Sequence, residues 1–144
     1  MIDPVAVCVG VIGPHAMPHS EADIIIQIRQ TGKAVTILED YAPRQAEGVF
    51  DGMAVDCTMQ LTTIHSDRSK ALDTAWDDIL KLSAAEGKGV DGLGWICHAQ
   101  VLVPPAASSD ASIPGDVWLF RSQVRVVVRA DRKEDQAWLS TVTS

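Results

Sequence analysis

His65, Ser66 and Asp67 stand side by side at the start of "HSDRSKALDTAWDDILKLSAAEG", and they are the residue types of a hydrolytic triad. A nucleophile, a base and an orienting acid must converge in space, whereas neighbours at a junction between strand and helix point in different directions. Ser66 or Asp67 is explained more simply as a helix cap, because either side chain can accept hydrogen bonds from free backbone N–H groups. No GxSxG turn accompanies the trio. We therefore expect no catalytic residue here.

A metal site could be assembled from His15, His19, Asp23 and His65, because imidazole and carboxylate groups suit zinc and other divalent ions. The His-x3-His spacing needs a helix, and Pro18 between the two histidines disfavours one. Solvated histidines in a loop explain the pattern better. We expect no bound metal.

Asp51 and Asp56, combined with Glu86 and Lys88, could serve a small metal-dependent nuclease. A chain with 19 acidic residues offers many such combinations, so this assignment is only an alternative. The segment "EGKGVDGLG" has neither the order nor the spacing of a phosphate-binding loop, and no cofactor is expected.

The composition of the chain indicates one soluble domain. Its 144 residues are enough to bury a core, and apolar residues make up 47% of them. A net charge of −7, without a basic cluster, argues against tight binding to nucleic acid. The apolar runs are too short to span a membrane. Three cysteines without ligand spacing are expected to be reduced and structural.

The first half of the chain contains a clear strand and a clear helix. Asp3 before Pro4 predicts a short N-terminal helix, followed by an irregular stretch up to residue 20. Isoleucine-rich residues 22–32 and alternating residues 53–65 predict strands. Residues 33–48 indicate a short strand and then a long polar loop or hairpin tip. A helix should follow residue 67, with Leu72, Ala75, Trp76, Ile79 and Leu82 forming its apolar stripe.

The second half predicts two more strands, at 92–105 and 114–130, joined by a soft linker over residues 104–115. The expected fold class is therefore α+β, with an antiparallel or mixed β-sheet of about four to five strands. One main helix, to which the N-terminal segment could add a short one, packs on one face. We expect a single domain over residues 1–144, comprising an irregular segment (1–20), an α+β core (21–129) and a C-terminal extension (130–144). Trp76, Trp95 and Trp118 are expected in the core.

Three arginines alternate with valines on the last strand, at Arg121, Arg125 and Arg129. They form either a solvated face or a surface that pairs with acidic groups on another copy. Tyr41 and Arg44 in the polar loop are of interface-prone types and leave the same two interpretations open.

Trp138 and Leu139 are apolar residues in an otherwise polar terminal segment. They either cover a groove of their own domain or anchor to a neighbour. Together with the residues above, they are the candidate interface with subunits or partners.

The order of these elements over residues 20–132 resembles the tail terminator family of long-tailed bacteriophages and related minor tail proteins. The resemblance rests on an alternating strand that runs into a helix bearing Arg68, Ala71 and Ala75. It also rests on Asp116 followed by a strand ending in Val-Arg-Ala at 128–130. The sequence departs from the family pattern in "GVIGPHAMPHS" and in its C-terminal extension.

The resemblance implies a non-enzymatic virion protein without catalytic residues. Family members form a homo-oligomeric ring, expected here as a hexamer, at the head-proximal end of the tail tube. The ring stops tube polymerisation and joins the tail to the head–tail connector protein. The implied partners are sister copies, the tail tube protein and the connector, while DNA passes through without specific binding and no membrane is involved. The implied location is the virion tail, reached from the host cytoplasm during assembly. The alternatives are another tail or neck protein, such as a tail-completion protein or tube subunit, and the nuclease.

Overall fold

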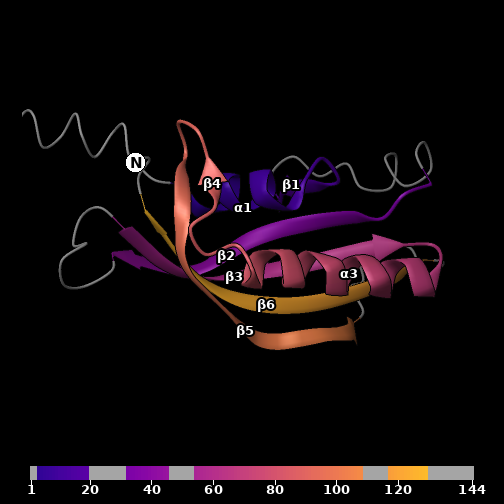
Figure 1. Ribbon diagram of the computed structural model, residues 1–144. Coiled ribbons are helices and arrows are strands. Elements are labelled where there is room, and N and C mark those ends of the chain that lie inside the picture. Colours follow the sequence, from indigo (N-terminus) through magenta and orange to yellow (C-terminus); the bar gives the residue numbers. More distant parts are fainter. Residues whose placement is uncertain (1–2, 20–31, 46–53, 109–116, 130–144) are drawn as a thin grey trace, which may run out of the picture.

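The computed structural model describes residues 3–19, 32–45, 54–108 and 117–129, with backbone only for residues 42–45. The described elements are, in chain order, α1 (Pro4–Ile12), β1 (Ala16–Pro18), β2 (Val35–Gln45), β3 (Ala54–His65), α3 (Arg68–Ser83), β4 (Gly89–Val90), β5 (Gly94–Ser108) and β6 (Trp118–Arg129) (Figure 1). The strand expected at 22–32, apart from its last residue, and the C-terminal extension lie outside the described residues.

The strands form one six-stranded mixed sheet in the order β1-β2-β3-β6-β5-β4. β1 pairs with β2 in parallel, and the other pairs are antiparallel. The α+β class with a mixed sheet is therefore confirmed, although the expected count of four to five strands is too low. β1 and β4 contain three and two residues, too few to show an alternating pattern in the sequence.

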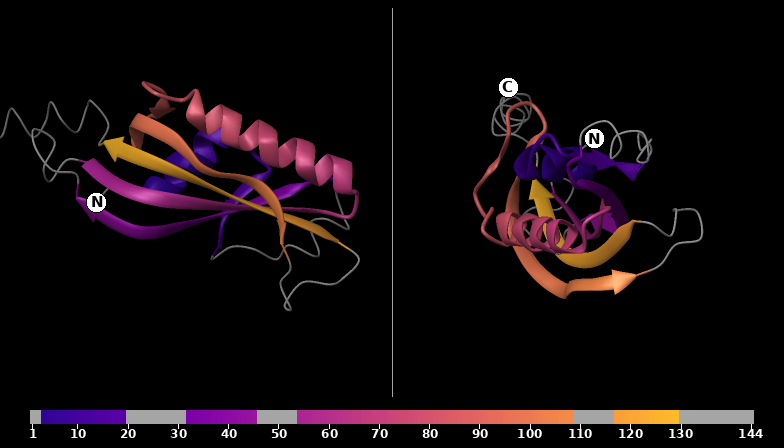
Figure 2. Two further views of the ribbon diagram at one scale, coloured as in Figure 1. Left: turned by 90° about the horizontal axis from the view of Figure 1, so that it is seen from below. Right: turned by 90° about the vertical axis from the view of Figure 1, so that its right-hand side faces the viewer.

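The sheet is strongly twisted and curls around the two helices (Figure 2). The largest apolar cluster lies between helices and sheet, so both helices cover the concave face. Its members include Val7, Cys8 and Ile12 of α1, Ile79 and Leu82 of α3, and side chains of five strands, among them Ala16, Leu38, Met59, Leu61, Ile96, Val124, Val126 and Val128. This cluster is the core of the described part of the chain.

The N-terminal segment contains the expected helix and an unexpected strand. The Asp3 side chain accepts hydrogen bonds from the backbone N–H groups of Val5 and Ala6, and Pro4 occupies the first turn. The irregular stretch expected after α1 is wrong for Ala16–Pro18, which pairs with Thr36–Leu38. The segment belongs to the sheet because it is anchored to β2 and α3 by contacts that local sequence does not reveal.

The alternating strand and the capped helix at the centre of the chain are both confirmed. Cys57, Met59 and Leu61 of β3 are buried on the concave face. Asp67 is the cap of α3, and its side chain accepts from the backbone N–H groups of Ser69 and Lys70. The junction that raised the question of a triad is therefore a strand end followed by a helix cap.

Two of the expected core tryptophans are exposed. Trp76 is 43% and Trp118 is 44% exposed, whereas Trp95 is partly buried. Trp76 lies on the flank of α3 rather than above the sheet, because Ala71, Ala75 and the carboxylate of Asp78 fill the buried side. The small alanines let the helix approach the sheet closely and leave the large side chains at its margin.

Two strands extend into segments that were expected to be loops. β2 continues to Gln45, with an irregular register between Tyr41 and Arg44, so the expected loop begins too early. β5 continues to Ser108, with register shifts around Val103, into the expected linker. The prolines in these two segments indicated loops. In strands at or near the edge of a sheet, however, β-bulges can accommodate proline.

Candidate assembly surface and polar groove

One exposed apolar surface lies along the outer edge of β5. Lys88 and β4 pair with β5 only as far as Ile96. Beyond it, no described strand pairs with the outer side of residues 97–108, which we call the open edge of β5. Leu102 and Val103 on this edge are 45% and 41% exposed. An exposed strand edge offers unpaired N–H and C=O groups to another chain.

This open edge carries no charged side chain from Ala99 to Ser108. Natural proteins usually protect exposed edges with lysine or other charges, with proline, or with bulges. Here the protection consists of Pro104, Pro105 and the register shifts between Val101 and Ala106. On a chain of net charge −7, an uncharged edge is a place where two copies can approach without electrostatic repulsion.

A second exposed apolar surface lies on α3. Leu72, Trp76 and Leu80 follow one another at intervals of four residues, and we call them the apolar flank. Leu80 is 55% exposed and Leu72 is partly buried. Exposed apolar residues that gather on one flank, including a tryptophan, are typical of a protein interface.

Trp118 and Arg68 extend this surface at the start of α3. The guanidinium carbon of Arg68 lies 5.6 Å from the centre of the Trp118 ring and 5.7 Å from that of Phe120. Both distances fit a cation–π contact, which is worth roughly 0.5–1 kcal/mol at an exposed site. The contact orders a tryptophan and an arginine at the surface, the two residue types most enriched in interface hot spots.

The arginine row interacts mainly within its own chain. Arg125 binds Asp56 through two hydrogen bonds of 3.0 and 2.6 Å, and this pairing raises the pKa of Arg125. Arg129 lies 5.9 Å from the Trp95 ring centre, and Arg121 donates to the Ser108 hydroxyl at 3.2 Å. All three side chains are partly exposed on the convex face. The row is therefore neither fully solvated nor free to pair with another copy without rearrangement.

The other candidate interface residues fall in different places. Tyr41 lies in β2, not in a loop, and is 42% exposed. The backbone of Arg44 pairs with Asp56 at the irregularity of β2, and its side chain is not described. Trp138 and Leu139 lie outside the described residues. The sequence identified Tyr41 but missed the open edge of β5 and the exposure of the apolar flank.

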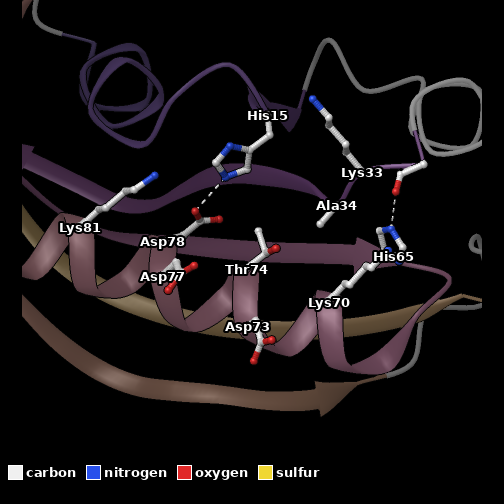
Figure 3. A pocket seen from close by; sticks show the side chains of 11 residues that line it. His15, Lys33, Ala34, His65, Lys70, Asp73, Thr74, Asp77, Asp78 and Lys81 are labelled. Carbon is white, nitrogen blue, oxygen red and sulfur yellow. Dashed lines mark hydrogen bonds and ion pairs between the residues drawn. The ribbon is translucent and has the colours of Figure 1, made fainter.

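A polar groove of about 480 Å³ separates the other flank of α3 from the N-terminal segment (Figure 3). Its lining mixes both signs of charge: His15, Gly32, Lys33, Ala34, His65, Lys70, Asp73, Thr74, Asp77, Asp78 and Lys81. Three lysines and three aspartates balance one another, so the groove does not favour an anion over a cation.

A buried hydrogen-bond network closes the floor of this groove. The fully buried carboxylate of Asp78 bonds His15 Nε2 at 2.8 Å and accepts from the Thr36 hydroxyl, which also contacts the Thr63 hydroxyl at 3.1 Å. Figure 3 shows the Asp78 carboxylate of α3 facing the His15 ring. Lys81 also donates to the backbone carbonyl of Ile12 at 3.2 Å. The network joins α3 to β1 and β2, and the buried position of Thr36 excludes it as a nucleophile.

His65 is occupied at both ring nitrogens. Nε2 lies 2.7 Å from the Gly32 carbonyl oxygen, so it donates, and Nδ1 accepts from the backbone N–H of Asp67 at 2.7 Å. These bonds fix one neutral tautomer and hold the strand–helix junction against the turn at Gly32. Both bonds are structural, since neither nitrogen is available to a substrate.

Among the described residues, those considered for metal and thiol chemistry do not converge. In the described ranges, no three His, Cys, Asp or Glu side chains are grouped as metal ligands would be. Asp23 and Asp51 lie outside these ranges, and Asp56 is held by Arg125. Cys8 and Cys57 are buried free thiols. Burial, aided by nearby negative charge, raises the pKa of Cys57 to about 12 and raises that of Cys8, so neither forms a thiolate readily.

No protein-family model matches the chain, and no curated protein matches its sequence. None of the described helices is long and apolar enough to cross a membrane.

Proposed function

We propose that this protein is a non-enzymatic virion component, a tail terminator that assembles as a ring on the head-proximal end of a phage tail tube. In this role the ring stops tube polymerisation and joins the tail to the head connector. The observation that carries the proposal is the uncharged open edge of β5 on an otherwise acidic chain. The resemblance in the order of elements supplies the specific role.

The exposed side chains give self-association a usable driving force. Covering a large apolar side chain that is already half-buried contributes about 1 kcal/mol. Trp76, Leu80, Leu102 and Val103 together therefore contribute about 4 kcal/mol before any hydrogen bond along the edge is counted. Part of this gain is offset by the lost freedom of the subunits. Several contacts in a closed ring reinforce one another, so modest individual contacts suffice.

The first test is the size of the purified protein, measured by light scattering over a range of concentrations, with and without tail tubes in electron microscopy. We expect one discrete oligomer and rings that cap tube ends and prevent further growth. Long open stacks would indicate a tube subunit instead. A chain that stays monomeric and ignores tubes would contradict the proposal.

A matched pair of lysine substitutions tests the surface itself. Val103→Lys places a charge on the open edge of β5, and we expect it to abolish the oligomer while leaving the fold intact by circular dichroism. Leu93→Lys changes a residue that is equally exposed, at 42%, in the turn before β5, and it should assemble normally. Equal behaviour of the two variants would exclude the edge as the contact.

A further inference from the structure

The opposite end of the sheet has a second open edge, on β2. β1 covers the outer side of β2 only opposite Thr36–Leu38. From Glu39 to Gln45, no described strand pairs with that side. Tyr41 is the exposed aromatic of this stretch. The described part of each copy thus has two different open edges, as a head-to-tail contact requires.

The register places the two edges at the same height on the sheet. Glu39 pairs with Gln60, which pairs with Gln123, which pairs with Val103. One row therefore crosses from the outer strand β2 to the outer strand β5. A second row runs from Tyr41 through Thr58 and Arg125 to Gln100 in the same way.

The strand directions make the two edges compatible. Three successive antiparallel pairs separate β2 from β5, so these two strands run in opposite directions. A neighbouring copy that is related by rotation about an axis parallel to the strands has each row of paired residues at the same position along that axis. Its β2 then lies antiparallel beside β5 of the first copy, with Glu39 opposite Val103 and Tyr41 opposite Gln100.

We propose that the occupant of the open edge of β5 at residues 99–103 is β2 of a second copy at residues 39–42, in antiparallel pairing. This inference rests on the proposed ring, for which it specifies the contact between neighbours. Repeated around an axis, the contact uses both edges of every copy and leaves neither exposed.

Charge favours this occupant. Glu39 of the incoming strand lies on the convex face, because it shares a row with Gln123, which alternates along β6 with the valines buried on the concave face. The arginine row lies on the same convex face as Gln123. One strand, β5, separates it from β6, so Glu39 lies about 10 Å from the backbone of the arginine row. Glu39 of one copy thus approaches the arginine row of the next across an edge without charges of its own, at a distance that leaves the contacts of these arginines within their own chain in place.

Pairing between two β5 edges is the competing arrangement. Pro104 and Pro105 lack an N–H and would interrupt both partners of such a pair. It would also close as a two-fold dimer and leave the Glu39–Gln45 edge exposed. The β2 stretch that the inference uses has no proline before Pro43.

The test introduces single cysteines on the two edges, in a Cys97→Ala background, and treats the protein with a short bis-maleimide crosslinker. Glu39→Cys and Val103→Cys should each remain uncrosslinked alone and should form covalent dimers when mixed. Both substitutions in one chain should give a ladder of covalent species whose largest member reports the copy number of the ring. Leu93→Cys combined with Glu39→Cys is the matched control and should give no ladder.

Light scattering on the same samples separates the possible failures. An intact oligomer that shows no ladder overturns this inference and leaves the proposed ring in place. Crosslinking of Val103→Cys with itself also overturns it, since it shows that β5 meets β5. A protein that is monomeric in every sample overturns both the inference and the proposed function.

Discussion

Replacing Asp78 should destabilise the fold far more than replacing its neighbour Asp77. Asp78 is fully buried and accepts hydrogen bonds from Thr36 and His15, whereas Asp77 is exposed. A hydrogen bond to a charged group contributes roughly 1.5–3 kcal/mol to the free energy of unfolding. Asp78→Ala removes two such hydrogen bonds, but it also removes the desolvation cost of the buried carboxylate. We therefore expect the free energy of unfolding to fall by about 2–3 kcal/mol.

Asp77→Ala is the matched control for this prediction. It removes a like-charge contact with Asp73, four residues earlier on α3, and such contacts cost roughly 0.2–0.5 kcal/mol. Alanine also favours a helix more than aspartate does. We therefore expect Asp77→Ala to leave stability unchanged or to raise it by about 0.5 kcal/mol.

Urea unfolding followed by circular dichroism measures both variants at one low protein concentration. A double-mutant cycle with His15→Ala should show a coupling of about 1 kcal/mol between His15 and Asp78, because the two side chains are in contact. Two aspartate variants within about 0.5 kcal/mol of each other would refute the reasoning, since the carboxylate would then not hold α3 to β1 and β2.

Three further changes have defined outcomes. Gly94→Ala should lower the free energy of unfolding, measured in urea, by more than about 2 kcal/mol. Gly94 has φ +145°, and an added Cβ would lie 2.5 Å from the Arg129 carbonyl oxygen. A variant as stable as the original protein would contradict this. Ser122→Ala should leave stability unchanged or raise it, because the buried Ser122 hydroxyl has no hydrogen-bond partner among the described residues. A loss of stability above about 1 kcal/mol would contradict this. Cys8 and Cys57 have pKa values raised in the folded state above the usual 9.0, so they favour folding below pH 9, and stability should fall progressively as pH rises from 9 towards 12. A Cys57→Ala variant should show a weaker fall over the same pH range, and equal slopes would contradict that role.

Local signals in the sequence predicted the main elements well. Asp3 with Pro4, and Asp67 at the second helix, are side-chain caps whose effect spans only a few residues, so sequence spacing reveals them. The alternation of β3 and β6 was equally readable because one face of each strand is buried against the core. These features depend on neighbours in the chain.

The missed features depend on residues that are distant in sequence. β1 exists because His15 reaches Asp78, 63 positions away, and nothing in "PHAMPH" shows that contact. The exposure of Trp76 depends on how closely Ala71 and Ala75 bring the helix to the sheet. The open edge of β5 could not be predicted, because a strand's place in a sheet is set by its partners and not by its own pattern.

The prolines of β5 also determine how strongly any one pair of copies can hold together. In the proposed contact, pairing along the outer side of β5 ends at Pro104, which lacks an N–H, so a bound strand gains only a few backbone hydrogen bonds. A contact that short dissociates readily on its own, and partly built arcs should fall apart before they accumulate. When the last subunit completes the ring, one additional contact forms without a further loss of translational and rotational entropy. Complete rings and single subunits should therefore dominate at equilibrium.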